Sequence, residues 1–282
     1  MRTILLKYIG AIRRNVFGIA VGFLLALIFQ FYVRDHYEAN VFKSLATAVR
    51  KKNHSPNQDS VLMTAMHVTH NLLTGRNSLF GRIASVDEPY DGTLTDDLLS
   101  AKGACGSYSD VLAQLLESLG YDVRIAQMKV HGRFGGHIVV EGRTLHGWVV
   151  MDPQFDCCFR KPSGQLASFE TVSENWTWYA PQTPPGYNMS YAYADVRYTN
   201  WNKIPVLLPA LRKCLVLAMG EPRVHDISIA PLLLRRYRWY SILLSVVTVL
   251  LIVFRYPPSL RPLVRRLRRK RQTPEAEKIL VA

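Results

Sequence analysis

Cysteine is scarce in this sequence: four residues among 282, at positions 105, 157, 158 and 214. This small number excludes a disulfide-rich scaffold, and because no two of them form a C-x-x-C pair, a structural zinc site is not expected. We expect free cysteines. A bond from Cys157 or Cys158 to Cys214 is the alternative in an oxidising compartment, because a bond between the two adjacent cysteines would be strained.

Acidic residues are also few, 21 against 35 basic residues, and the formal net charge is +14. An excess of this size is typical of nucleic-acid binding, but its distribution argues against that partner. Residues 1–33 carry +4 and residues 255–282 carry +7, which leaves only +3 for the rest. Because each basic end adjoins an apolar run, we expect contact with membrane lipid and no nucleic acid. Binding of anionic lipid or RNA by the C-terminal cluster is the alternative to a solvated tail.

Charge is absent from two long apolar runs. Residues 16–33 form the first, which has a basic flank like that of a signal peptide. It ends in "FQFYVRDH", without the small residues of a cleavage site, so an uncleaved anchor is favoured. Residues 239–254 form the second, between Arg238 and Arg255. Arginine stems reach the membrane interface from such positions, which favours a second span over a buried core helix.

The basic clusters predict the topology, since Lys and Arg gather on the cytoplasmic side. We expect an integral protein of a bacterial inner membrane with both termini cytoplasmic, although Arg235, Arg236 and Arg238 would then lie outside. The predicted parts are a basic N-terminus (1–15), a transmembrane helix (16–33), a periplasmic domain (34–238), a second transmembrane helix (239–254) and a basic tail (255–282).

The stretch "GACGSYSDVLAQLLESLGYDVRI", residues 103–125, predicts a helix with Cys105 at its start. Ser107 or Ser109 could cap it and Gly120 ends it. Unpaired amides and the positive dipole end at a helix start favour the thiolate. The helix has one apolar stripe, formed by Val111, Leu112, Leu115, Leu116 and Leu119.

Residues 58–75 also have helical spacing, with Gly75 as the stop. His67 and His70 stand three apart on this helix, a spacing that metal sites use. No further ligand is evident, so we interpret them as ordinary surface or interface histidines, and no metal site is predicted.

Two β-rich runs, "HIVVE" and "WVVMD", flank a polar connection and predict a hairpin centred near residues 144 and 145. His137 and Asp152 would then lie roughly opposite each other. With Cys105 they would supply the nucleophile, base and orienter of a catalytic triad. Asp156 is an alternative orienter. His131 and His146 are interpreted as solvated.

The strings "GACGSYSDVLAQLLESLGYDVRIAQM", "GGHIVVEG" and "GWVVMDPQ" resemble the transglutaminase-like superfamily over residues 58–160. Cys105, His137 and Asp152 match its triad, and Gly120, Tyr121, Arg124, Trp148 and Pro153 match its framework. Family members often carry Ala-Trp after the histidine, where this sequence has Ile138-Val139. The resemblance implies an α+β, papain-like core and thiol acyl transfer, with an oxyanion hole that uses the Cys105 N–H.

The expected function is therefore a membrane-anchored cysteine enzyme that transfers or hydrolyses peptide or amide bonds of a peptide or protein substrate. The chemistry needs no metal or organic cofactor. A cysteine peptidase of a membrane-proximal protein, and a non-catalytic binding or scaffold module in envelope assembly, are the alternatives. Eight aromatics in residues 174–201 predict either a loop packed over the core or a substrate groove.

Overall fold

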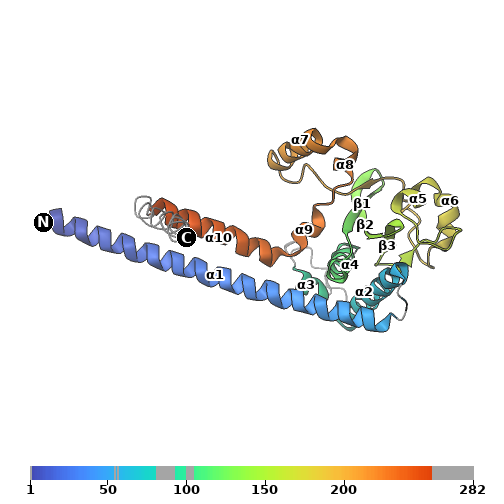
Figure 1. Cartoon of the computed structure of the whole chain (residues 1–282), viewed down its shortest axis with the longest axis horizontal. Coiled ribbons are helices and arrows are strands. Elements are labelled where there is room, and N and C mark those ends of the chain that lie inside the picture. Colours follow the sequence, from blue (N-terminus) through green and yellow to red (C-terminus); the bar gives the residue numbers. More distant parts are fainter. Residues whose placement is uncertain (1, 54, 56, 81–92, 100–104, 256–282) are drawn as a thin grey trace, which may run out of the picture. The chain divides into compact units, whose positions relative to one another are not determined.

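The computed structural model describes residues 2–53, 55, 57–80, 93–99 and 105–255. It has two compact units. One comprises the residues up to Asp35 together with those from Tyr237 onward, and the other is His36–Arg236. The described residues of the second unit form a mixed helical and antiparallel β fold, so the predicted α+β class is confirmed (Figure 1).

Helix α1, Arg2–Lys52, contains the first predicted membrane segment and continues well beyond it. Residues 34–52 include no proline or glycine to stop a helix. Phe42, Ala46 and Val49 recur at helical spacing and are fully or almost fully buried in the core of the second unit. Burial of this stripe stabilises the extension of the helix into the folded domain.

Helix α10, Arg236–Arg255, contains the second apolar run. Phe31 of α1 contacts Tyr237 and Tyr240, with ring centroids 6.1 Å and 5.4 Å apart. Arg255 lies 6.0 Å from the ring of Phe17. The apolar windows of α1 and α10 are long enough to cross a membrane and are 0% and 6% buried, respectively. A core helix of a soluble protein would instead be mostly buried.

The described strands form a five-stranded antiparallel sheet in the order β4-β3-β2-β1-β5. The strands are β1 Val123–Val130, β2 Arg133–Thr144, β3 Gly147–Asp152, β4 Cys157–Cys158 and β5 Val196–Arg197. The predicted hairpin is present, with Thr144 paired to Gly147 across its turn. Strand β2 begins at Arg133, earlier than the predicted run, so His137 lies inside the strand.

Alternate side chains of the central strands enter two separate apolar clusters. Val140 and Met151 pack with α2, Gln58–Phe80, and α4, Cys105–Leu119, on one face of the sheet. Val139 and Val150 pack on the other face with an aromatic cluster that includes Phe159. Because successive residues of a strand point to opposite faces, covering both faces explains the continuous apolar runs.

Helix α4 follows its predicted pattern, since its whole apolar stripe is buried and Gly120 ends it with φ +94°. The amide of Tyr121 bonds to the carbonyl of Leu116, which closes the helix end. The predicted stop of α2 at Gly75 is wrong, because α2 continues to Phe80. A glycine inside a helix costs only about 1 kcal/mol, which contacts of the following turn offset. One of these is the bond from Asn77 to the Tyr108 hydroxyl.

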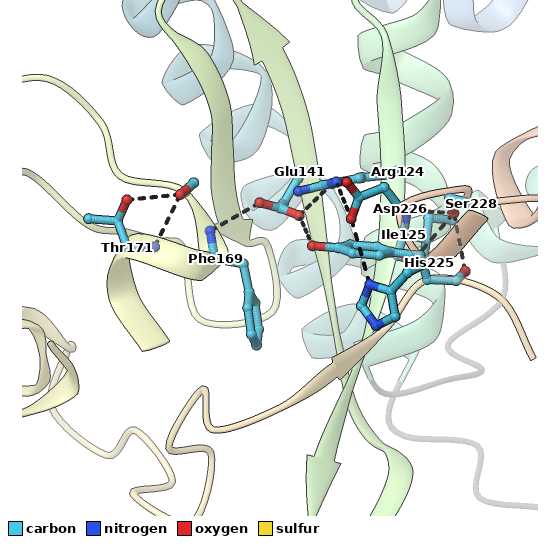
Figure 2. Close-up of polar contacts among 10 residues, drawn as sticks. Arg124, Ile125, Glu141, Phe169, Thr171, His225, Asp226 and Ser228 are labelled. Atoms are coloured by element: carbon cyan, nitrogen blue, oxygen red, sulfur yellow. Dashed lines mark hydrogen bonds and ion pairs between the residues drawn. The ribbon is translucent and has the colours of Figure 1, made fainter. Parts of the chain in front are cut away.

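A buried ion pair links the sheet to the later part of the domain (Figure 2). Nε of Arg124 lies 2.7 Å from a carboxylate oxygen of Glu141, and both side chains are almost fully buried. The second oxygen of Glu141 accepts the Phe169 amide. The Arg124 guanidinium lies between the rings of Trp148 and Tyr198, 4.3 Å and 4.1 Å from their centroids. Arg124 thus joins β1 to three separate segments of the chain.

Candidate active site

Cys105 is the first residue of α4, as predicted, and it is partly exposed. The proposed serine caps are wrong. The Ser107 hydroxyl donates to Asp97 of α3, Leu94–Leu99, and the Ser109 hydroxyl donates to the Ile138 carbonyl of β2. The second bond ties the first turn of α4 to the strand that carries His137. The thiol is therefore held at a fixed position beside that strand.

His137 and Asp152 form a buried hydrogen-bonded pair. Nε2 of His137 lies 2.6 Å from Oδ2 of Asp152, and both side chains are 0% exposed. A carboxylate only accepts hydrogen bonds, so Nε2 carries the proton. The register pairs Val140 with Met151, which makes His137 and Asp152 diagonal neighbours across the strands and not directly opposed ones. Strand β2 pairs with β3 only from Val140 to Thr144, so His137 lies beyond that pairing, although it still pairs with Met128 of β1.

The other ring nitrogen of His137, Nδ1, has no carboxylate partner in the part of the chain that the structure describes. Nδ1 is buried, and among the described residues no group meets the distance and angle of a hydrogen bond to it. The Cys105 thiol nevertheless lies close enough to act on the ring. Burial lowers the pKa of His137, but the interactions of the ring with Asp152 and Cys105 outweigh burial and raise it from 6.5 to about 9. Asp152 thus holds Nε2, and Nδ1 remains available to exchange a proton with the Cys105 thiol or a bound substrate.

An aromatic cover over this pair was missed by the sequence reasoning. The ring of Tyr191 stacks on His137, with centroids 4.1 Å apart and planes at 5°. Phe155 meets His137 edge-on at 6.0 Å. The Tyr187 hydroxyl donates to Oδ2 of Asp152 at 3.2 Å and accepts from the Tyr193 hydroxyl at 3.3 Å. Parts of residues 174–201 therefore pack over the core, which was the first of the two alternatives for this segment. Two of its tyrosines, Tyr187 and Tyr191, contact the His137–Asp152 pair.

Asp156, the alternative orienter, forms its hydrogen bond with His67 and not with His137. Its carboxylate lies 2.6 Å from Nδ1 of His67 on α2. Nδ1 of His70 donates to the Pro153 carbonyl at 3.1 Å. The two histidines thus hold the turn that follows Asp152 against α2, and geometry favours Asp152 over Asp156 as the partner of His137. Their interpretation as ordinary interface histidines fits these contacts.

The remaining candidates take no part in this cluster. His131 and His146 are exposed and lie in the turns on either side of β2. All four cysteines are free, and Cys157 and Cys158 form the short strand β4. Within the described ranges no three His, Cys, Asp or Glu side chains gather as a metal site would require. Residues 81–92 and 100–104, which include Gly103, and residues 256–282 of the basic tail lie outside the described residues.

A cysteine at a helix start, facing a histidine–carboxylate pair on an antiparallel sheet, is the arrangement that the sequence resemblance implied. Residues 43–153 match the family model of the Transglutaminase-like superfamily. This chain carries a transglutaminase-like domain. Comparison with curated proteins and with solved structures found no match.

The matched region of the transglutaminase-like domain holds Cys105, His137 and Asp152, and it ends at Pro153. Phe155, Tyr187 and Tyr191 all follow it. The aromatic cover of the pair is therefore built from the part of the chain outside the family match. Arg124, Trp148 and Glu141 lie inside the match, while Tyr198 and Phe169, which complete the buried ion-pair cluster, lie outside it.

Proposed function

We propose that this protein is a membrane-anchored, transglutaminase-like cysteine enzyme that transfers or hydrolyses acyl groups of peptides or amides. The observation that carries the proposal is that the two ring nitrogens of His137 have different surroundings. Nε2 is held by the buried carboxylate of Asp152, buried Nδ1 has no hydrogen-bond partner among the described residues, and the Cys105 thiol is close enough to raise the pKa of the ring. Catalytic hydrogen bonds are often long until substrate binds, so the open geometry at Nδ1 fits the proposal.

The reaction begins with the thiolate of Cys105 and the imidazolium of His137. Sγ attacks the substrate carbonyl carbon, and the negative charge on the carbonyl oxygen is met by the N–H of Cys105 at the start of α4, where amides lack intrahelical acceptors. His137 gives the Nδ1 proton to the leaving amine as the C–N bond breaks and a thioester forms. Water or a second amine then attacks the thioester, His137 accepts its proton, and Cys105 leaves as thiolate. Asp152 accepts the Nε2 hydrogen bond and stabilises the imidazolium.

The test is capture of the acyl-enzyme on the full chain in lipid nanodiscs. An activated peptide ester is the acyl donor, and mass spectrometry locates the adduct. We expect a thioester on Cys105 that turns over with water or an added amine, and none in Cys105→Ser. Cys214→Ser is the matched control, because Cys214 is also a free and exposed thiol. Equal labelling of Cys105 and Cys214, or complementation of a knockout by Cys105→Ala, would instead favour the scaffold module.

The membrane anchoring is part of the same proposal. Two apolar helices with almost no buried surface support it, together with the charge of the chain ends. We propose that both termini lie in the cytoplasm and residues 34–238 outside it, in a bacterial inner membrane. Reporter fusions at residue 282 and within the turn at Ser163 test the topology. A C-terminal reporter that is active only outside the cytoplasm would overturn it.

A further inference from the structure

Helix α7, Leu207–Met219, is apolar and yet contributes no buried residue. Its sequence, "LLPALRKCLVLAM", contains two basic residues and no acidic one. Leu217 is 89% exposed, Leu207 is 63% exposed, and Val206 just before the helix is 83% exposed. By contrast α4, of similar length, buries ten side chains. A helix this apolar is normally covered.

Apart from Met219 at the helix end, the exposed apolar residues occupy one broad face. At about 100° per residue, Leu207, Leu211, Cys214 and Ala218 fall along a single line. All four are exposed. Arg212, on the far side, pairs with Glu221 of the short helix α8, Glu221–His225. The partly covered residues, Leu208, Pro209, Arg212, Leu215 and Val216, lie on that same far side.

Charge and position point to the occupant of the open face. Between Trp201 and Arg223 the chain has four basic residues and one acid, and Lys203, Lys213 and Arg223 are exposed. The segment ends shortly before α10, one of the two helices proposed to cross the membrane. With 13 residues α7 is too short to span a bilayer, which takes about 20. A wide apolar face flanked by basic side chains is typical of helices that lie in the interface.

We infer that α7 lies in the membrane interface, with the Leu207–Leu211–Cys214–Ala218 face among the acyl chains and the flanking basic side chains at anionic headgroups. The inference rests on the proposed anchoring by α1 and α10. It adds a third, monotopic contact that belongs to the catalytic unit itself, since α7 is part of His36–Arg236. This contact holds the domain close to the bilayer surface, which restricts substrates to those at or near the membrane.

The test uses Cys214 as a native probe position in the full chain in nanodiscs of mixed zwitterionic and anionic lipid. Labelling is carried out at pH 7 in a Cys105→Ser background. Burial raises the pKa of Cys158 to about 11 and raises the pKa of Cys157 further, so we expect the exposed Cys214 to react with the fluorescent maleimide before either of them. The fluorophore is quenched either by aqueous iodide or by lipids brominated near the headgroup. Ser163→Cys in an exposed turn and Leu250→Cys on α10, each with Cys214→Ser, are the water and membrane controls.

We expect the Cys214 probe to be quenched by the brominated lipid and to be at least about threefold less sensitive to iodide than the Ser163→Cys probe. If the Leu250→Cys probe is lipid-quenched and the Cys214 probe behaves like Ser163→Cys, the interfacial helix is wrong while the anchoring stands. Protection of Cys214 from iodide without lipid quenching would mean that protein, such as a second copy, covers α7, and would also overturn the inference. Absence of lipid quenching at Leu250→Cys would overturn the anchoring itself.

Discussion

The hydroxyl of Tyr187 donates a 3.2 Å hydrogen bond to Oδ2 of Asp152, the same oxygen that lies 2.6 Å from Nε2 of His137. Two donors therefore converge on one oxygen of the carboxylate, and Asp152, His137 and Tyr187 are all buried. A hydrogen bond to a charged group contributes about 1.5–3 kcal/mol, so this contact is large enough to position the carboxylate. Tyr187 acts through Asp152 and is a positioning residue.

Replacing Tyr187 with phenylalanine tests this role. With one donor fewer, Asp152 is less well fixed and attracts the His137 proton more strongly. We expect acylation of Cys105 to slow about threefold to tenfold, and the alkaline limb of its pH profile to move to higher pH. Tyr179→Phe is the matched control, because Tyr179 is a buried tyrosine of the same aromatic cluster that does not touch the pair. A rate loss with no shift of the limb, shared by both variants, would indicate packing alone.

The raised pKa of His137 predicts a pH dependence of Cys105 reactivity. With its pKa raised to about 9, His137 keeps its proton across neutral pH and supports the thiolate. The rate of iodoacetamide alkylation at Cys105 should therefore be high from neutral pH upward, and turnover should fall as the pH rises through about 9 and the imidazolium is lost. In His137→Ala we expect neutral-pH reactivity to fall about 100-fold. Mass spectrometry reads Cys214 in the same sample as an internal reference, and identical profiles for the two thiols would contradict the pairing.

The raised pKa of His137 also predicts that the free energy of unfolding depends on pH. A histidine whose pKa is higher in the folded than in the unfolded state stabilises the fold in full below the unfolded value of about 6.5. That contribution, about 3 kcal/mol, is lost as the pH rises to about 9. Chemical unfolding of the full chain should therefore show falling stability between these pH values, with a weaker slope in His137→Gln. Equal slopes in both proteins would contradict the assignment.

Asp152 and Asp156 offer a comparison of two carboxylates four residues apart. Asp152→Asn removes the charge that raises the pKa of His137, while burial of the ring remains. We expect the alkaline limb to move below pH 9 and acylation to fall about 100-fold to 10,000-fold. Asp156→Asn should leave the alkaline limb and the acylation rate unchanged, because Asp156 pairs with the half-exposed His67 and not with His137. Stopped-flow acylation across pH measures both variants, and a larger effect at Asp156 would reverse the assignment of the orienter.

Local patterns predicted the parts of the site that depend on neighbours in sequence. The apolar stripe of α4 placed Cys105 at a helix start, and the hairpin placed His137 near Asp152. Tyr187 and Tyr191 could not be found in this way, because they reach the pair from an irregular segment 35 or more residues after Asp152. The end of α2 was misplaced for a related reason, since contacts such as that of Asn77 with Tyr108 outweigh the preference of Gly75.

The buried pair of Arg124 and Glu141 gives the last prediction. In Arg124→Gln the carboxylate of Glu141 stays buried and loses the Nε contact, so we expect a loss of about 3–5 kcal/mol in the free energy of unfolding. Arg124→Lys should recover only part of it, because an ammonium group cannot stack between the rings of Trp148 and Tyr198 as the planar guanidinium does. Denaturant unfolding of the full chain in mild detergent measures these values.

Two further variants separate the ion pair from general packing. Arg143 also lies over Trp148, at 5.9 Å, but it is exposed, so Arg143→Gln should change stability by less than about 0.5 kcal/mol. Glu141→Gln added to Arg124→Gln removes the uncompensated charge and should restore part of the lost stability. A double variant whose loss equals the sum of the two single losses would show that the two charges are not coupled. In that case the cost at Arg124 would come from the lost contacts with Trp148 and Tyr198.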